Sequence, residues 1–238
     1  MRFDRHYFVD RGLRGNVKLL LTSGGITNNS LENALVELLG KPIADASALF
    51  IPTAVYGQRN AIEMAWRVLT GEGMPPMVNL GWKSVGILEL ISLPSAGRDT
   101  WKDVVRATDA LLVWGGDPMF LDYWMRESGL AELLPTLPEE MVYVGMSAGS
   151  MVLTPDIGED FVRWNAPTGG HRTLGLVNFS IFPHLDHPML PDNTMAAAEK
   201  WASELSGPAY VMDDATAIKV VDGTVEVVSE GHWKLLNS

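Results

Sequence analysis

Short apolar runs that alternate with helical patterns constrain the fold of this chain more than any other feature of its sequence. Each run is bounded by turn residues, which is typical of strands that are buried on both faces of a parallel sheet. The predicted strands lie at 17–22, 46–54, 85–91, 109–116 and 141–146. The predicted helices between them lie at 28–40, 56–71, 99–108 and 118–127. This βαβα alternation predicts an α/β fold with a doubly wound, mostly parallel sheet flanked by helices.

The pattern becomes more mixed after residue 147. Short strands are predicted at 160–164, 179–184 and 208–212, and a helix is predicted at 190–205. Residues 217–228 read as a C-terminal β-hairpin around Asp222-Gly223. The sequence contains no linker, repeat or low-complexity segment, so residues 1–238 are expected to form a single α/β domain.

Composition excludes several classes of function. The chain has 238 residues, 47% of them hydrophobic, which is ample for a buried core. It has no cysteine, so disulfides, thiolate metal sites and a cysteine nucleophile are excluded. Its net charge is −11 and its Lys and Arg are scattered, which argues against a nucleic-acid partner. No apolar run approaches the roughly 20 residues that span a bilayer, and residues 1–15 are too charged for a signal peptide, so we expect a cytoplasmic protein without a membrane partner.

The stretch "MVYVGMSAGSMVL" at 141–153 provides a candidate nucleophile. A strand that ends in Gly-x-Ser-x-Gly and leads into a helix turns sharply at the serine, which exposes the serine hydroxyl. Ser147 occupies that position. A strand–helix junction that needs only small residues would have the same spacing, so both interpretations stay open at this point.

Three glycine-bearing turns follow predicted strands, at the edge of the sheet where doubly wound folds bind ligands. They are Ser23-Gly24-Gly25, Gly115-Gly116-Asp117 and Gly145 to Gly149. Backbone N–H groups of Gly116 and Ala148 could hold a developing oxyanion at such turns. A tight turn that is capped by Asp117 would demand the same residues, and the two interpretations are compatible.

A serine nucleophile needs a base, and a third group should fix the tautomer of that base. The histidines are His6, His171, His184, His187 and His232. His184 is favoured because it directly follows the apolar run "FSIF", whose end should reach the edge of the sheet. His187 precedes Pro188 in a turn, and His171 lies in the turn-like "APTGGHRT", so both are expected to be solvated. A histidine at the edge of a sheet can also serve only as a hydrogen-bonding residue.

The acidic partner has several candidates, any of which could be a surface carboxylate. They are Asp156, Glu159, Asp160, Asp186, Asp213 and Asp214. Asp214 is favoured over Asp160 and Asp186 because Asp213-Asp214 follows the short apolar run "PAYVM". A carboxylate at such a strand end can be held rigidly against an imidazole.

These segments together resemble the peptidase E (aspartyl dipeptidase) and cyanophycinase family of serine peptidases. The matching segments are "LLLTSGG", "ALFIPTA", "LLVWGGDPMFL", "VYVGMSAGSMVL", "FPHL" and "VMDDATAIKVVDG". The resemblance implies a class I glutamine amidotransferase-like fold without a metal or organic cofactor. It also implies that Ser147, His184 and Asp214 form the triad and that Gly115-Gly116 lies at the oxyanion hole.

The chain departs from this family at three places. Asp117 stands where the family commonly has Asn, and Asp214 stands where aspartyl dipeptidases often have Glu. After His184, the stretch "DHPMLPDNTMAAAEKW" replaces a basic and polar stretch that suits an acidic substrate. A strong preference for N-terminal aspartate is therefore not expected. The order Ser, His, acid also differs from the Ser, acid, His order of α/β-hydrolases, which disfavours a lipase-like esterase.

The sequence thus predicts a cytoplasmic serine peptidase that acts on dipeptides or other short peptides. Ser147 attacks the carbonyl, His184 transfers the proton, Asp214 orients the imidazole, and the Gly116 and Ala148 amides hold the oxyanion. One alternative is an amidase or esterase that uses the same site on a non-peptide substrate. Another is a non-catalytic protein of this fold that binds a small molecule or a partner. The sequence does not decide whether the protein forms a homo-oligomer.

Overall fold

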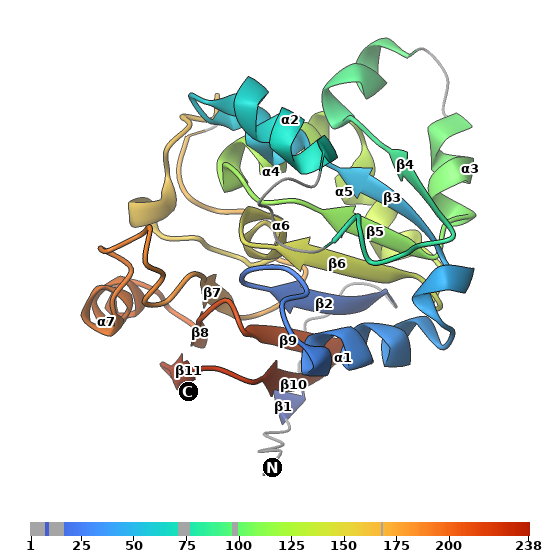
Figure 1. The fold of residues 1–238 in the computed structure, drawn as a ribbon. Coiled ribbons are helices and arrows are strands. Elements are labelled where there is room, and N and C mark those ends of the chain that lie inside the picture. The colour runs from blue at the N-terminus through green and yellow to red at the C-terminus, as the bar shows by residue number, and fades with distance from the viewer. Residues whose placement is uncertain (1–7, 10–16, 71–76, 97–99, 168) are drawn as a thin grey trace.

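The computed structural model describes residues 8–9, 17–70, 77–96, 100–167 and 169–238, and a large mixed sheet is its central feature (Figure 1). In spatial order its strands are β1 (Phe8–Val9), β10 (Thr224–Ser229), β9 (Thr216–Val221), β2 (Lys18–Thr22), β6 (Val142–Met146), β5 (Ala110–Val113), β3 (Ser47–Ile51) and β4 (Ser84–Ile87). Neighbouring strands from β2 to β4 in this order are parallel. The mostly parallel sheet that the sequence predicts is therefore confirmed.

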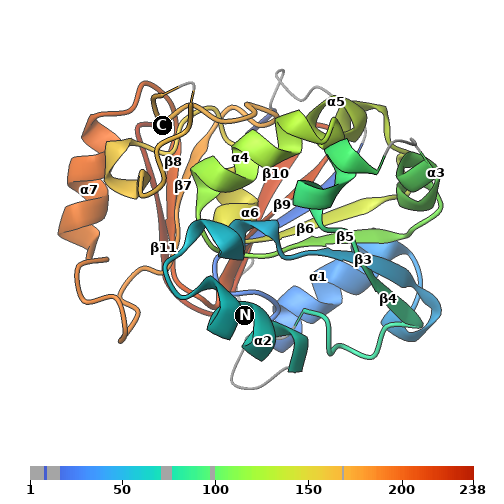
Figure 2. The same ribbon diagram turned by 90° about the horizontal axis from the view of Figure 1, so that it is seen from above.

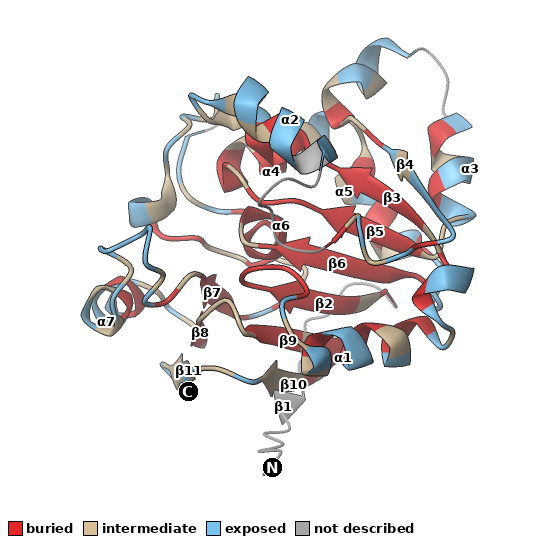
Figure 3. Ribbon diagram, in the orientation of Figure 1, coloured by how far each residue is buried: buried red, intermediate tan, exposed pale blue. Residues whose placement is uncertain are grey.

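Helices cover both faces of this sheet (Figure 2). They are α1 (Asn29–Leu39), α2 (Ala61–Thr70), α3 (Thr100–Arg106), α4 (Pro118–Glu127) and α5 (Leu130–Leu133). Alternate residues of a strand point to opposite faces, and β5 follows this rule: Leu111 and Val113 pack with α3, α4 and α5. Ala110 and Leu112 pack with α1 and α2 on the other face. The sheet interior is buried throughout (Figure 3), which confirms the doubly wound arrangement.

A smaller sheet stands beside the large one and consists of β7 (Ser180–Phe182), β8 (Ala209–Met212) and β11 (Trp233–Leu236) in the order β11-β8-β7. The helix α7 (Met195–Ser203) packs on it through Ala198 and Trp201, which contact the cluster of Phe182 and Val211. Because β7 and β8 are parallel, their carboxyl ends reach the same edge. A short turn after β8 leads into β9 of the large sheet, so the two sheets meet at this edge.

The predicted C-terminal hairpin is present as β9 and β10, which pair antiparallel around Asp222-Gly223. The hairpin also joins the large sheet, because β9 pairs antiparallel with β2. In this register Thr22 lies opposite Ala217, so the start of β9 lies at the carboxyl end of β2. Residues that precede β9 are thereby brought to the edge of the sheet where β2 and β6 end.

The prediction of a strand at 160–164 is wrong. Residues Glu159–Phe161 form a 3-10 turn, and the chain beyond them is irregular. The apolar side chains of this segment act as separate anchors: Phe161 packs against Phe182, and Trp164 packs against Phe120. Their spacing reflects these individual contacts and not one face of a strand.

Other differences lie at element boundaries. The strand predicted at 85–91 ends at Ile87, and β4 is an edge strand whose Ile87 is 57% exposed, so burial on both faces is wrong for this strand. The helix predicted at 190–205 begins only at Met195, because Thr194 caps it. Residues 71 and 99, at the ends of two predicted helices, lie outside the described residues. Within the described ranges, no helix combines the length and apolarity needed to cross a bilayer.

Candidate active site

Ser147 lies at a strained turn between β6 and the short helix α6 (Ala148–Met151). Its backbone has φ 51° and ψ −114°, a conformation that a non-glycine residue rarely adopts. The turn is held by a hydrogen bond from the Ser147 N–H to the Thr22 carbonyl at 3.1 Å. It also requires glycine at 149, because a β-carbon there would collide with the Val113 carbonyl of β5. The Gly-x-Ser-x-Gly sequence therefore produces a turn that leaves the Ser147 side chain partly exposed above a buried helix.

His184 follows β7 and joins Ser147 to Asp214. Its Nε2 lies 2.8 Å from Ser147 Oγ, and its Nδ1 lies 2.7 Å from Asp214 Oδ1. The His184 backbone is also in the left-handed region, with φ 59°. The structure thus brings together the three residues that the sequence selects, from three separate parts of the chain.

Asp214 reaches His184 because it lies in the turn between β8 and β9, where the two sheets meet. Burial raises the pKa of Asp214, but hydrogen bonds from His184 and Ser23 and the nearby imidazoles of His184 and His187 outweigh burial. The net effect holds the pKa of this carboxyl below its ordinary value. Asp214 is therefore a carboxylate at neutral pH and can accept the Nδ1 proton of His184.

Ser23 completes this cluster, and the sequence interpretation gave it no role. Its Oγ donates to Asp214 Oδ1 at 2.8 Å and accepts from the backbone N–H of His184 at 2.7 Å. The residue is fully buried at the carboxyl end of β2. Its place in the turn Ser23-Gly24-Gly25 was the available signal, because that turn was expected at the same edge as the nucleophile.

The turn Gly115-Gly116 lies beside the nucleophile, as the order of β5 and β6 requires. A β-carbon placed on Gly115 would lie 3.2 Å from the Ser147 β-carbon. Gly116 has φ 146°, and a side chain there would collide with the Ala54 carbonyl. Asp117, the next residue, is the N-cap of α4, so the positive end of this helix directly follows the Gly115-Gly116 turn. This arrangement suits an anion that develops on a carbonyl bound at Ser147.

Asp117 caps α4 and is only 2% exposed. Its Oδ1 accepts from the Phe120 N–H at 2.9 Å. Burial raises the pKa of Asp117 above its ordinary value, although backbone N–H donors and the charge of Arg163 act against burial. The carboxyl therefore stabilises the turn as a cap, while its ionised form is disfavoured by its surroundings.

The other histidines differ in their surroundings. His187 was expected to be solvated, but its Nε2 lies 3.6 Å from Asp214 Oδ2 and its side chain is 32% exposed, so that expectation is wrong. His171 was also expected to be solvated, but its Nδ1 lies 2.6 Å from Asp156 Oδ1. His232 is 93% exposed at its side chain, and His6 lies outside the described residues.

The remaining acidic candidates have other roles or none in this site. Asp213 accepts from the Ala215 N–H and from Thr216 Oγ1, which shapes the turn before β9. Asp160 and Asp186 are exposed. In the part of the chain that the structure describes, no group of three or more His, Asp or Glu side chains is arranged to hold a metal ion.

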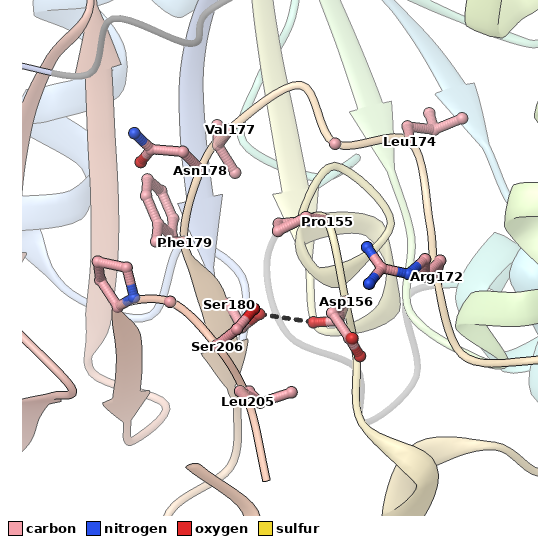
Figure 4. A pocket seen from close by; sticks show the side chains of 13 residues that line it. Pro155, Asp156, Arg172, Leu174, Val177, Asn178, Phe179, Ser180, Leu205 and Ser206 are labelled. Carbon is pink, nitrogen blue, oxygen red and sulfur yellow. Dashed lines mark hydrogen bonds between the residues drawn. The ribbon is translucent and has the colours of Figure 1, made fainter. Parts of the chain in front are cut away.

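Two cavities lie at opposite ends of the strands β7 and β8. The first measures about 640 Å³ and is lined by residues such as Pro155, Arg172 and Leu205 (Figure 4). The hydrogen bond from Ser180 Oγ to the Asp156 carbonyl closes one side of it at 2.6 Å. Ser147, His184 and Asp214 are absent from its lining. The second cavity, of about 330 Å³, touches the site because Asp214 and His187 line it.

Comparisons with known proteins identify the family and the fold of this chain. A model of peptidase family S51 matches residues 19–228. Among solved structures, a candidate peptidase E protein from Listeria monocytogenes EGD-e is 21% identical, with a TM-score of 0.61 over 90% of this chain and 99% of that chain. A peptidase from an acI-B1 Actinobacterium is 20% identical, with a TM-score of 0.63 over 93% and 94% of the two chains. These likenesses show a shared fold. The chain matches none of the curated proteins with which it was compared.

Proposed function

Because the chain belongs to peptidase family S51 and is therefore a peptidase, we propose that it is a serine enzyme that hydrolyses dipeptides or other short peptides. The observation that carries the proposal is the continuous contact from Ser147 Oγ through the His184 ring to Asp214, with both links below 3 Å. Structural relatives that are described as peptidase E and as a peptidase support the same choice.

The proposed reaction begins when Ser147 Oγ attacks the scissile carbonyl and His184 Nε2 takes the hydroxyl proton. Asp214 accepts a hydrogen bond from Nδ1–H of His184 and stabilises the imidazolium that forms. The Gly116 and Ala148 amides bind the oxyanion. His184 then gives its proton to the leaving amine, which departs and leaves an acyl-enzyme. A water molecule then attacks this ester while His184 accepts one of its protons. The second product leaves when the bond to Ser147 Oγ breaks and His184 returns that proton to Oγ.

The proposed substrate is a short peptide without a strong requirement for N-terminal aspartate. Residues 185–199 follow the base and contain no Lys or Arg, while Asp186, Asp192 and Glu199 are present. A side-chain carboxylate of a substrate would therefore find no Lys or Arg in this segment. The cytoplasmic location and the assembly state remain predictions from the sequence.

Labelling with a fluorophosphonate tests the proposal, because such a probe reacts with an activated serine. We expect the wild-type protein and the surface control Ser203→Ala to be labelled, and Ser147→Ala to be unlabelled. A panel of dipeptides then measures turnover, which should fall about a millionfold in Ser147→Ala by analogy with triad deletions. Labelling without hydrolysis of any peptide would favour the amidase or esterase. Absence of labelling in the wild type would favour a non-catalytic binding protein.

A further inference from the structure

The two oxygens of the Asp214 carboxylate have different partners. Oδ1 accepts hydrogen bonds from His184 Nδ1 at 2.7 Å and from Ser23 Oγ at 2.8 Å. Oδ2 faces Nε2 of His187 at 3.6 Å, which is an electrostatic contact and too long for a hydrogen bond. The acid of the proposed triad is therefore shared between two imidazole rings.

The orientation of the His187 ring follows from its second nitrogen. The backbone N–H of Met189 donates to His187 Nδ1 at 3.1 Å. A neutral imidazole carries its proton on the nitrogen that does not accept, so the proton of neutral His187 is on Nε2 and points toward Asp214. The His187 and His184 rings lie 5.9 Å apart between centroids, with an interplanar angle of 72°.

We propose that His187 is a positioning residue of this site. Its neutral ring directs an N–H at the second oxygen of Asp214. Once protonated, the His187 ring competes with His184 for the negative charge of Asp214. The inference rests on the proposed roles of Ser147, His184 and Asp214. His187 does not touch the reacting atoms in this scheme. It acts through the carboxylate that holds the base.

The charged and titratable groups around His187 come from three segments. Asp213 and Asp214 belong to the turn between β8 and β9, Asp186 and His184 belong to its own segment, and His232 precedes β11. Within the described part of the chain, Asp214 is the acidic group in ion-pair range of the His187 ring. Asp213 is engaged with the backbone and with Thr216. The carboxylate nearest to the His187 ring is therefore Asp214, which is also the proposed partner of the base His184.

Sharing one carboxylate has a consequence for pH dependence. Hydrolysis needs neutral His184 in the free enzyme, so activity falls on the acid side as His184 takes up a proton. Two imidazolium rings on one carboxylate repel each other, so a protonated His187 makes protonation of His184 harder. His187 therefore extends activity toward lower pH. Its removal should shift the acid limb of the profile to higher pH.

Two substitutions at 187 separate the charge from the N–H donor. His187→Gln keeps a donor without a titrating ring, and His187→Phe keeps neither. The acid limb of the pH profile of kcat/KM should lie at higher pH in both variants, which lowers the rate on that limb relative to wild type. At pH 8 His187→Phe should fall about tenfold, and His187→Gln should fall less. The matched control is His232→Gln, which removes the other imidazole of the same cavity and should behave as wild type.

Two results would overturn the inference. One is a wild-type acid limb and rate in both His187 variants, in an enzyme that hydrolyses peptides and loses activity with Ser147→Ala. The other comes from a measurement that needs no activity, the NMR titration of the His187 ring in wild type and in Asp214→Asn. The ring signals should differ between the two proteins, because only the wild type has the Asp214 charge 3.6 Å from Nε2, and identical signals throughout would refute the contact. A wild-type protein that cleaves no peptide would contradict the proposed function and leave this titration as the test of His187.

Discussion

Ser23 Oγ lies 2.8 Å from Asp214 Oδ1, although the two residues are 191 positions apart in the chain. The same hydroxyl accepts the backbone N–H of His184 at 2.7 Å. One buried side chain at the end of β2 therefore holds both the proposed base and the proposed acid. This relationship gives the first prediction.

Ser23→Ala should weaken both the fold and the site. The substitution leaves the His184 N–H without its partner, which costs about 1–3 kcal/mol in the free energy of unfolding. It also removes one of the two donors to Asp214 Oδ1, so we expect kcat to fall about tenfold to a hundredfold. Thermal unfolding and peptide turnover measure the two effects. Wild-type values for both would show that Ser23 positions neither residue.

Asp214→Asn should keep the fold but favour the wrong tautomer of His184. Turnover at neutral pH should fall by about 10⁴, as in the chymotrypsin example of such a substitution. Asp160→Asn and Asp186→Asn serve as matched controls, because both residues are exposed, and should cost much less. His184→Ala beside His187→Ala tests the base in the same assay. A larger loss at Asp160 or at His187 than at Asp214 and His184 would reassign the site.

The substrate preference follows from the segment after His184. Because residues 185–199 contain no Lys or Arg and the first such residue after His184 is Lys200 on α7, Asp-Leu should not be strongly preferred over Ala-Leu. The measurement is the ratio of specificity constants for the two dipeptides. A preference for Asp-Leu above about a hundredfold, or roughly 2.7 kcal/mol, would require a cation elsewhere in the site.

Asp117→Asn should stabilise the protein at neutral pH. Because burial raises the pKa of Asp117 in the folded state, ionisation of this carboxyl opposes folding. The penalty is absent below the unfolded-state pKa and grows as pH rises toward and through the raised folded-state value. Asn keeps the cap on α4 without the charge. Tm should therefore exceed that of wild type at pH 7 to 8, and the difference should vanish toward pH 3.

The control for Asp117 is Asp122, which is also buried and whose pKa burial also raises. Asp122 differs because Arg126 forms two hydrogen bonds with its carboxylate. Asp122→Asn breaks this pair and should not raise Tm at neutral pH. No stabilisation by Asp117→Asn would mean that burial of an ionised Asp117 carries no penalty, and an equal stabilisation by Asp122→Asn would mean that Arg126 does not offset the burial of Asp122.

The parts of the fold that local sequence predicts are those with a local cause. β2, β3, β5 and β6 are buried on both faces, so their apolar runs identify them. The turn at Ser147 is also predictable, because close approach of the backbone requires glycine nearby. β4 has a similar apolar pattern, but its local sequence does not indicate that it is the edge strand of the sheet. Pairing of β9 with β2 joins residues about two hundred positions apart, and local periodicity does not encode such pairings.

The residues of the candidate site also differ in whether local sequence reveals them. Strand ends were sufficient to select His184 and Asp214, because a strand end fixes the edge that a residue reaches. Ser23 was missed because its role depends on two residues that the fold brings from a distance. His187 was misjudged because two left-handed residues, His184 with φ 59° and Asp186 with φ 52°, turn the chain back. That reversal returns the ring of His187 to Asp214.

The position of β9 beside β2 also dictates when the site can form during synthesis. The ribosome makes β2 and the turn at Ser147 long before it makes β9, which is the neighbour of β2 on its other edge. The carboxylate that is proposed to orient His184 is made only when residue 214 is added. A nascent chain that ends before residue 214 therefore contains the proposed nucleophile and the proposed base but lacks the proposed acid. Until then the proposed base has no carboxylate to fix its tautomer, so the complete site exists only after β8 has been made.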